Sequence, residues 1–578
     1  MLRRFIRLGR RYALVFALAL TFTIAWRNYG FWVLPPRFLT PASRSFAVGD
    51  ITYRTSSYDW AKAPVHHPVQ EILAPPVGPP LRLPKTQARF ASAAQDEVAE
   101  ARKGAIKAKF DKSWQAYKKH AWPNDALKPL SAKGSKSLSG WSAQTVDALD
   151  TLWIMDMKDD FYAAVRVVAR IDWSRTSDWS IDVFEVTIRY LGGLLAAYDL
   201  SGEAVLLAKA VELGDTLYAA FDTPNRMPVR WLNYGKAVRG RSVAQEKMSG
   251  AAGSTLCLEF TRLSQLTGDP KYYDAAERVK QFLKSWQPKT KIPGIWPITM
   301  NWRDGIMEGQ RFSIGAGMDS LYEYLPKMYA ILGGLDAEYK EMTLRAFDTV
   351  RRLMLFRPMT PTNDKNLLMA GVVVATNGGK PRLVGDMQHL ACFAGGTYAL
   401  AGKLFSRDDY IETGARLARG CVWAYRAFPT GIMPEKANMA ICRTYDGPCA
   451  AMLPKDRNHA LPVGFMRMID SRYILRPEAI ESVFYLWRIT GDQEWRDAAW
   501  TMWEAIVRET ETETAFAAIK DVREPGGPKL DEMETFWMGE TLKYFYLIFE
   551  DASVLNLDEW VLNTEAHPLR RPMSNDEA

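Results

Sequence analysis

Two carboxylates and a guanidinium stand together at the start of an apolar helical segment. The stretch "RYILRPEAIES", residues 472–482, contains Arg476, Glu478 and Glu481, and the run "VFYLWRIT" follows it directly. Pro477 suits the first turn of a helix, and a glutamate in that turn compensates the partial positive charge of the helix end. Glu478 alone would therefore be an ordinary helix start. The addition of Arg476 and Glu481 favours a site at which acid groups carry out chemistry.

Charged side chains occupy comparable positions in other apolar helical segments. Glu185 and Arg189 lie four residues apart in "IDVFEVTIRYLGG", on one face of a buried helix where an ion pair is costly to desolvate. Asp319 precedes an aromatic helix, Glu540 lies within an apolar one, and His389 heads "HLACFAGG". An N-cap would explain Asp319 alone, and a satisfied core histidine would explain His389 alone. Together the acids predict a cavity ringed by carboxylates, which suits glycoside hydrolysis because that reaction needs an acid and a base.

A repeated unit organises the segments that carry these residues. Three segments each contain an apolar helix, then Ser or Thr, Gly and an acid, then an amphipathic helix. They begin at Gly192, Leu258 and Glu481, and their joints are Gly202-Glu203, Gly268-Asp269 and Gly491-Asp492. Glycine can adopt the positive φ that ends a helix, and the acid after it can cap the next helix.

Alternation of very apolar with amphipathic helices predicts two concentric layers. We expect an all-α fold, an (α/α)7 barrel in which seven helical hairpins form a toroid over residues 106–569. An α-solenoid is the alternative, but it would show a stricter period and capping repeats. The sequence therefore favours the closed toroid, with the ends of the inner helices lining a cavity.

The first part of the chain differs in composition from the rest. Arginines precede an apolar run that its flank extends to membrane-spanning length, and Pro-rich stretches follow. A cleaved signal peptide is the alternative for the apolar run. The expected parts are a cytoplasmic basic tail at 1–11, a signal-anchor transmembrane segment at 12–34, a Pro-rich luminal stem at 35–105, the barrel at 106–569 and a tail at 570–578.

The net charge of +8 does not indicate a nucleic-acid partner. Five arginines of the N-terminal tail, at positions 3, 4, 7, 10 and 11, supply most of it. No basic stripe with a nucleic-acid motif appears elsewhere, so we expect no nucleic-acid partner.

Five cysteines occur, at positions 257, 392, 421, 442 and 449. A luminal compartment permits disulfides, and an odd number leaves one thiol unpaired. Cys257 lies in an apolar helical pattern and is the expected free, buried thiol.

Nine motifs in order carry a resemblance to a known family: "VDALDTL", "FEVTIRYLGGLLAAY", "LEFTRLSQLTGD", "DSLYEYLPK", "HLACFAGG", "PTGIMPE", "LRPEAIES", "GETLKYFYLIF" and "NTEAHPL". The chain resembles glycoside hydrolase family 47, the class I α-1,2-mannosidases, over about 106–569. The resemblance implies an (α/α)7 barrel that hydrolyses terminal α-1,2-linked mannose from high-mannose N-glycans of glycoproteins, with inversion and a bound Ca²⁺. Together with the predicted signal anchor, we expect a single-pass type II protein of the ER or Golgi membrane with a luminal catalytic domain.

The resemblance also assigns roles to individual residues. Glu185 matches the general acid, which acts through water, Glu478 matches the general base, and Asp319 matches a third essential carboxylate. Thr564 matches the Ca²⁺ ligand, through its carbonyl and hydroxyl oxygens. The residues expected around the sugar and the waters of the ion are Arg189, His389, Arg476, Glu481, Glu540 and Glu565. Cys392 and Cys421 match the family disulfide, whereas a bridge between Cys442 and Cys449 would lie outside the family pattern.

Two departures from the family pattern concern the outer polar shell. Ala252 stands where many members have an acid, and Gln388 stands where many have Asp. They bear on the rate and on which glycan branch is trimmed first. One alternative is a glycan-binding protein similar to the ER degradation-enhancing mannosidase-like proteins, with little or no hydrolysis. A helical scaffold whose carboxylates are only caps is another, and it predicts neither Ca²⁺ dependence nor sugar binding.

Overall fold

The computed structural model describes residues 45–48, 51–90, 96–360, 362, 364–376, 378–442, 449 and 459–574. The chain divides into two compact units, residues 1–43 and 44–578, and only the second contains described residues. The predicted basic tail and the predicted transmembrane segment, 1–34, lie outside the described residues. Within the described ranges, no helix has both the length and the apolar character that crossing a membrane requires.

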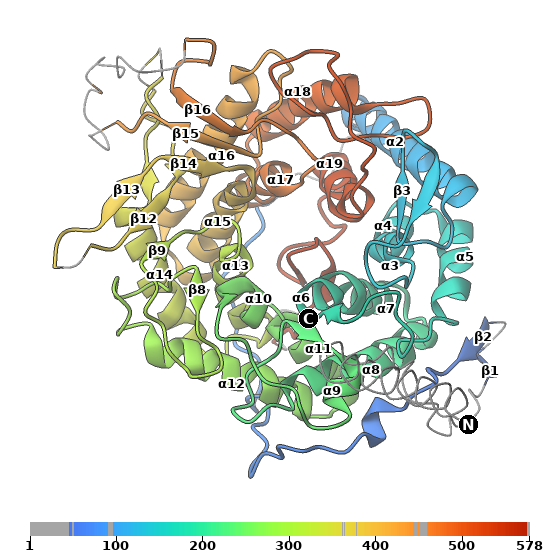
Figure 1. Cartoon of the computed structure of the whole chain (residues 1–578). Coiled ribbons are helices and arrows are strands. Elements are labelled where there is room, and N and C mark those ends of the chain that lie inside the picture. The colour runs from blue at the N-terminus through green and yellow to red at the C-terminus, as the bar shows by residue number, and fades with distance from the viewer. Residues whose placement is uncertain are drawn as a thin grey trace, which may run out of the picture. The chain divides into compact units, whose positions relative to one another are not determined.

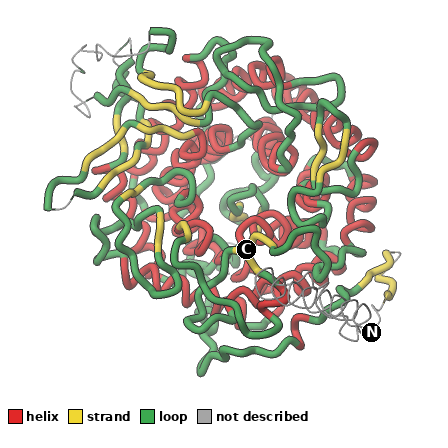
Figure 2. The backbone as a smooth tube through the Cα atoms, viewed as in Figure 1, coloured by secondary structure: helices red, strands yellow, loops and turns green. Residues whose placement is uncertain are grey.

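Helices are the main regular structure of the described chain, and they form two concentric layers (Figures 1 and 2). The inner layer consists of α3 (Ala143–Asp147), α4 (Leu149–Ile154), α6 (Val183–Glu185), the π-helical turn η2 (Val186–Leu191), α7 (Gly192–Ser201), α10 (Gly250–Ser254), α11 (Cys257–Thr267), α13 (Asp319–Ile331), η4 (His389–Phe393), α15 (Ala394–Phe405), α17 (Glu478–Thr490), the π-helical turn η5 (Trp537–Thr541) and α19 (Leu542–Phe549). The outer layer consists of α2 (Glu97–His120), α5 (Lys158–Val168), α8 (Ala204–Tyr218), α12 (Lys271–Trp286), α14 (Ala337–Leu353), α16 (Asp408–Ala427) and α18 (Gln493–Thr510).

The two layers close into a ring. Among the described elements, α4, α7, α11, α13, α15 and α17 each pack against the outer helix that follows them in the chain. The last inner helix, α19, packs instead against α2, the first outer helix, and its π-helical start contacts α4. The first and last helices therefore meet, as Figure 1 shows, and the predicted helical barrel is confirmed over the solenoid.

The repeated joints have the predicted backbone geometry. Gly202, Gly268 and Gly491 end their helices with φ of 71°, 73° and 75°. At the second joint, the Asp269 carboxylate accepts a hydrogen bond from the Lys271 amide at 3.1 Å. The acids of the other two joints stand at the N-cap position but make no side-chain cap hydrogen bond. The glycines therefore determine the backbone geometry of these joints, because glycine adopts positive φ without strain.

Short strands and small helices lie mainly in the loops (Figure 2). The strands are β1 (Ser45–Val48), β2 (Ile51–Arg54), β3 (Ala126–Lys128), β4 (Lys133–Ser135), β5 (Ile181–Asp182), β6 (Trp231–Leu232), β7 (Met248–Ser249), β8 (Thr299–Met300), β9 (Arg311–Phe312), β10 (Leu355–Phe356), β11 (Met369–Ala370), β12 (Val372–Val374), β13 (Arg382–Val384), β14 (Asp386–Gln388), β15 (Lys436–Met439), β16 (Phe465–Asp470), β17 (Trp560–Leu562) and β18 (Pro568–Arg570). Every strand pairing is antiparallel in the described residues, and β13-β12-β9 and β14-β15-β16 form three-stranded sheets. The remaining helices are η1 (Trp60–Lys62), η3 (Ala219–Phe221) and α9 (Tyr234–Ala237).

The C-terminal hairpin β17–β18 reaches into the middle of the ring (Figure 1). Near its tip, the His567 ring contacts Asp150 at 3.0 Å and Asp147 at 3.1 Å. The Lys543 ammonium of α19 donates to Asp150 at 2.7 Å and to the Ala566 carbonyl at 2.8 Å. These buried charges hold the hairpin between the first and last inner helices.

Residues 51–90, which lie in the segment predicted as a stem, follow the outside of the barrel and are bound to it. Their amides donate to carboxylates at helix ends and in loops, as from Leu73 to Asp274 at 2.8 Å and from Thr86 to Asp558 at 2.6 Å. We call residues 51–90 the strap. A Pro-rich chain without helical periodicity can be ordered in this way, because side-chain acceptors replace the missing internal hydrogen bonds.

Helix α2 begins at Glu97, nine residues before the expected boundary, and Asp96 caps it.

The cysteines pair in two bridges. Cys392 and Cys421 are joined across 29 residues, as the family resemblance implied. Cys442 and Cys449 close a second, seven-residue loop. Cys257 is the free, buried thiol, which confirms the prediction made from its apolar surroundings.

Candidate active site

Four candidate residues stand at the beginnings of inner helices. Asp319 and Glu478 are the first residues of α13 and α17, and His389 is the first residue of η4. Glu185 ends the single turn α6, three residues after its N-cap Asp182. Since inner helices run side by side around the ring, their N-terminal ends bring these side chains to one end of the barrel.

Glu478 is held from both sides. One carboxylate oxygen lies 2.8 Å from Nδ1 of His389, and the other accepts from Arg476 at 3.3 Å. Nε2 of His389 lies 2.8 Å from the Tyr425 hydroxyl, which fixes the ring. Burial acts in the opposite direction, but the Arg476 guanidinium and the His389 hydrogen bond hold the pKa of Glu478 below its usual value. Glu478 is thus a fixed, ionised carboxylate.

Glu185 belongs to a second charged cluster. The Arg189 guanidinium donates to Glu185 at 2.9 Å and to Glu565, at the tip of the C-terminal hairpin, at 2.9 Å. Arg189 lies in the π-helical turn η2, and Glu540 lies in the corresponding turn η5. Such turns recur at functional sites. The Glu185 side chain is 29% exposed and can meet a ligand, whereas Arg189 is buried behind it.

Asp319 shares an electrostatic environment with Glu478. Burial raises the pKa of the Asp319 carboxyl to about 7, and the neighbouring Glu323 and Glu478 carboxylates add to the rise. The only hydrogen bond to its carboxylate among the described residues comes from the Ser320 amide at 3.1 Å. The side chain is partly exposed, so its protonation can respond to a bound ligand.

A proton-sharing group of carboxyls lies between the two clusters. Burial raises the pKa of Glu565 to about 8, and burial with the neighbouring Glu565 raises the pKa of Glu540 well above its usual value. The two carboxyls hydrogen-bond to each other, which requires a proton on one of them. Burial and the Glu323 carboxylate likewise raise the pKa of Glu481. The region holds more acids than cations to balance them.

Thr564 stands beside these carboxyls at the hairpin tip. Its amide donates to the Tyr324 hydroxyl at 3.2 Å, and that hydroxyl donates to Glu259 Oε1 at 2.7 Å. The second oxygen of Glu259 is buried and has no hydrogen-bond partner among the described residues. In the described part of the chain no three His, Cys, Asp or Glu side chains form a metal cage. The surplus of acidic oxygens around Thr564 nevertheless fits a Ca²⁺ bound by threonine oxygens and by waters that hydrogen-bond to the carboxylates.

The structure adds site residues that the sequence arguments did not single out. Glu435, within the quoted motif "PTGIMPE", accepts from Arg476 at 2.5 Å. Glu323 pairs with the buried Lys327 in α13, next to Glu481. Among the described residues, the carboxylate partners of Arg476 are Glu478 and Glu435. For Glu323 the available signal was a charged residue inside an apolar helical motif, whereas Glu435 lies in a loop.

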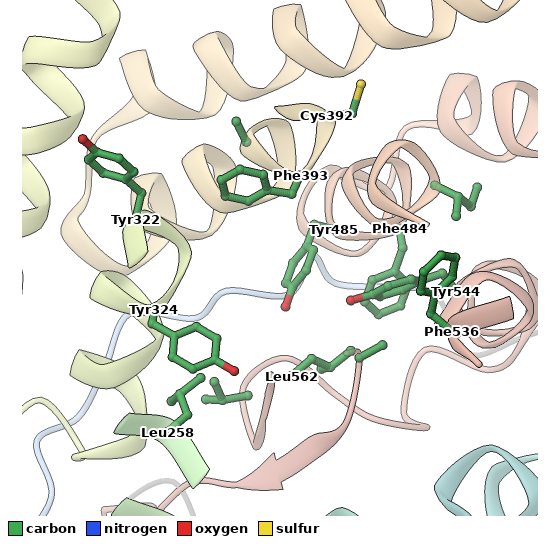
Figure 3. Packing of buried hydrophobic residues seen from close by; sticks show 14 of the residues in the cluster. Leu258, Tyr322, Tyr324, Cys392, Phe393, Phe484, Tyr485, Phe536, Tyr544 and Leu562 are labelled. Atoms are coloured by element: carbon green, nitrogen blue, oxygen red, sulfur yellow. The ribbon is translucent and has the colours of Figure 1, made fainter. Parts of the chain in front are cut away.

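Buried apolar side chains pack around the charged residues. Figure 3 shows Leu258, Tyr324 and Leu562 around the base of the hairpin, and Phe484, Tyr485 and Tyr544 on neighbouring inner helices. Phe536 lies near both guanidinium groups of the site, 5.6 Å from Arg189 and 5.9 Å from Arg476. The Phe536 ring is therefore close to both charged clusters.

Both departures from the family pattern are accommodated in the structure. Ala252 is buried in α10, where its methyl group is part of the core. Gln388 accepts a hydrogen bond from the Ala316 amide at 2.9 Å, in the loop before Asp319. The amide of Gln388 thus ties β14 to the loop that positions Asp319.

Comparison with known proteins agrees with this arrangement. The family described as glycosyl hydrolase family 47 matches residues 109–571. A mannosyl-oligosaccharide α-1,2-mannosidase of Coccidioides posadasii is 37% identical over 502 residues, which cover 83% of this chain and 92% of that protein. Mouse mannosyl-oligosaccharide 1,2-α-mannosidase IB is 34% identical over 507 residues, 85% of this chain and 73% of that protein. The solved α-1,2-mannosidase from Trichoderma reesei has a TM-score of 0.74 and 32% identity, and covers 82% of this chain and 99% of that one. This chain therefore belongs to glycosyl hydrolase family 47.

Proposed function

We propose that this glycoside hydrolase is a Ca²⁺-dependent, inverting α-1,2-mannosidase that removes terminal α-1,2-linked mannose from high-mannose N-glycans. The observation that carries the proposal is the convergence of Glu185, Asp319 and Glu478, from helices far apart in the chain, at one end of the barrel. The mannosidase names of relatives that match over most of the chain support the substrate class.

In the proposed reaction the two charged clusters face opposite sides of the scissile bond. Glu478, held ionised by Arg476 and His389, removes a proton from the attacking water. Glu185 delivers a proton to the leaving sugar through a water, and the Arg189 contact orients it. Asp319 lies close enough to Glu478 for the charge of that carboxylate to affect its pKa. Its protonation therefore changes with the charge that develops in the site during the reaction.

Bound Ca²⁺ would supply a positive charge that orients the hydroxyls of the terminal mannose. Thr564 would bind it directly, while Glu540 and Glu565 would accept hydrogen bonds from its waters once their shared proton has left. The ion would offset the repulsion between these carboxylates, which explains why they lie so close together.

We also propose that the protein acts in the secretory pathway, anchored in the ER or Golgi membrane with the barrel in the lumen. The support comes from the arginine-flanked apolar run of 12–34 and from the two disulfides, which suit an oxidising compartment.

The proposal predicts chelator-sensitive release of mannose by the full chain. Incubation with a high-mannose glycan should release mannose, with the β-anomer as the first product in proton NMR spectra. A chelator should abolish release, and added Ca²⁺ should restore it. Glu478→Gln should lower kcat by about 10²–10⁴-fold while the unfolding midpoint stays unchanged.

Three results would contradict the proposal in different ways. Glycan binding without release by the wild-type chain would favour the degradation-enhancing type of glycan-binding protein. Full activity in chelator would exclude the Ca²⁺ requirement. An α-anomer as first product would exclude inversion.

A further inference from the structure

Exposed apolar side chains gather at the rim beside Glu185. Trp179 is 67% exposed, Trp231 50%, Val243 47% and Ile306 38%. We call these four residues the rim patch. They come from three separate loops, and Trp is a costly side chain to leave in water unless it contacts something.

Hydrogen bonds join these loops into one surface. The Asn233 amide donates to the Trp179 carbonyl at 3.0 Å. Gln245 accepts from the Arg230 amide at 2.9 Å through its side chain, and from the Trp302 and Arg303 amides at 3.1 Å through its carbonyl. The isolated β-bridge between Asn301 and Ile306 completes the connection. The rim patch is thus built from loops that are fixed to one another.

The surface is continuous with the candidate acid. Trp231 lies opposite Asp182 in the β5–β6 pair, and Asp182 caps the turn that ends at Glu185. The Arg230 guanidinium lies 5.3 Å from the Trp231 ring and pairs with Asp182 at 3.2 Å. The Arg230 carbonyl accepts from the Val183 amide at 2.8 Å, the first residue of α6. A ligand on Trp231 would therefore touch the structure that positions Glu185.

Charged groups are interleaved with the apolar ones. The side chains of Arg230 and Arg303 are 39% and 44% exposed, and that of Glu246, which pairs with Arg303, is 55% exposed. Sugar rings combine flat apolar faces with hydroxyls at their edges, so indole faces beside guanidinium and carboxylate groups match them on both counts. A wholly apolar polypeptide segment would leave these charges without partners.

We propose that the rim patch binds other sugars of the same branched oligosaccharide, beyond the terminal mannose that is cleaved. The inference rests on the proposed function and deepens it, since it makes Trp231 a determinant of specificity for large glycans over short ones. Binding energy from remote sugars then serves the reaction at Glu185 and Glu478.

The test compares a high-mannose glycan with α-1,2-mannobiose, whose two sugars fill only the cleavage site. Trp231→Ala should lower the ratio of kcat/KM for the glycan to kcat/KM for the disaccharide about tenfold, equivalent to ~1.4 kcal/mol. Trp231→Phe should recover most of the ratio because it keeps an aromatic face. Tyr162→Ala, which removes a 37% exposed aromatic from the outer helix α5, should leave the ratio unchanged.

An unchanged ratio in Trp231→Ala would overturn the inference. A loss seen with an intact glycoprotein but not with the free glycan would also overturn it, because the patch would then bind polypeptide. Direct binding separates this failure from failure of the proposed function. In the Glu478→Gln background, calorimetry with the free glycan should show about tenfold weaker binding when Trp231 is Ala, whether or not the wild-type chain releases mannose. Equal binding would overturn the inference.

Discussion

At the residue scale, two neighbouring carboxyls have opposite protonation preferences. Arg476 and His389 hold the pKa of Glu478 down against burial, while burial and nearby acids raise the pKa of Asp319 to about 7. Pairs of titratable groups whose environments push their pKa values apart are typical of acid–base sites. Asp319 therefore stays largely protonated in weak acid, where Glu478 is already ionised.

This raised pKa predicts a pH-dependent contribution to stability. Because the folded-state pKa of Asp319 is about 7 and its ordinary value is 3.8, folding favours the protonated form. The resulting stability is complete below about pH 4 and is lost as the pH rises through about 7. Relative to Asp319→Asn, the wild-type chain should lose about 3 kcal/mol between pH 4.5 and 7.5.

Urea unfolding at several pH values, in chelator, measures this difference. Asp497→Asn, at an exposed position of α18, is the matched control and should show no such trend. A difference between wild type and Asp319→Asn that is constant with pH would mean that Asp319 is ionised throughout.

At the element scale, the strap extends the folded unit beyond the helical barrel. Its side chains Tyr53, Trp60 and Leu83 are buried, and its amides are bound by acceptors on the barrel. Asp222 binds two successive amides of the strap, because its carboxylate accepts from the amides of His66 at 2.9 Å and His67 at 2.7 Å. A catalytic fragment that began at residue 106 would lack both α2's first turns and this covering.

Asp222→Ala should therefore release the strap around His66. The expected loss in free energy of unfolding is about 1–3 kcal/mol, since two part-buried amides lose a charged acceptor. Urea unfolding and limited proteolysis near residue 66 check this. Asp59→Ala is the control, because Asp59 pairs only with Lys62 within the strap. Unchanged proteolysis in Asp222→Ala would show that the strap is held by other contacts alone.

At the scale of the whole barrel, closure depends on buried charges between its first and last helices. Lys543 in α19 and Asp150 in α4 are both fully buried and 2.7 Å apart, and the C-terminal hairpin shares the pair through His567. Removing one partner of a buried pair leaves an uncompensated charge.

Lys543→Ala should therefore destabilise the protein by about 3–5 kcal/mol. The loss should also lower glycan hydrolysis, because the hairpin that carries Thr564 loses its anchor. Thermal and urea unfolding measure the first effect, with Lys119→Ala, an exposed lysine of α2, as the control. A loss below about 1 kcal/mol would mean that the ring closes without this pair.

The sequence by itself determined the repeat, the helical barrel and the family, because these depend on local signals. Gly202, Gly268 and Gly491 mark the joints, and apolar periodicity separates inner from outer helices. The free thiol at Cys257 followed from the same local pattern. The roles of Glu185, Asp319 and Glu478 stay predictions, although the structure brings the three together.

Only the tertiary structure decided which charges are partners. Arg476 pairs with Glu435, 41 residues away, and Glu565 meets Arg189 across 376 residues. The strap lies in the predicted Pro-rich stem, and its contacts with the barrel could not be predicted, since the acceptors belong to distant parts of the chain. Hydrogen bonds between distant segments produce no periodic pattern in the sequence. Their donors and acceptors come together only when the ring of helices has closed.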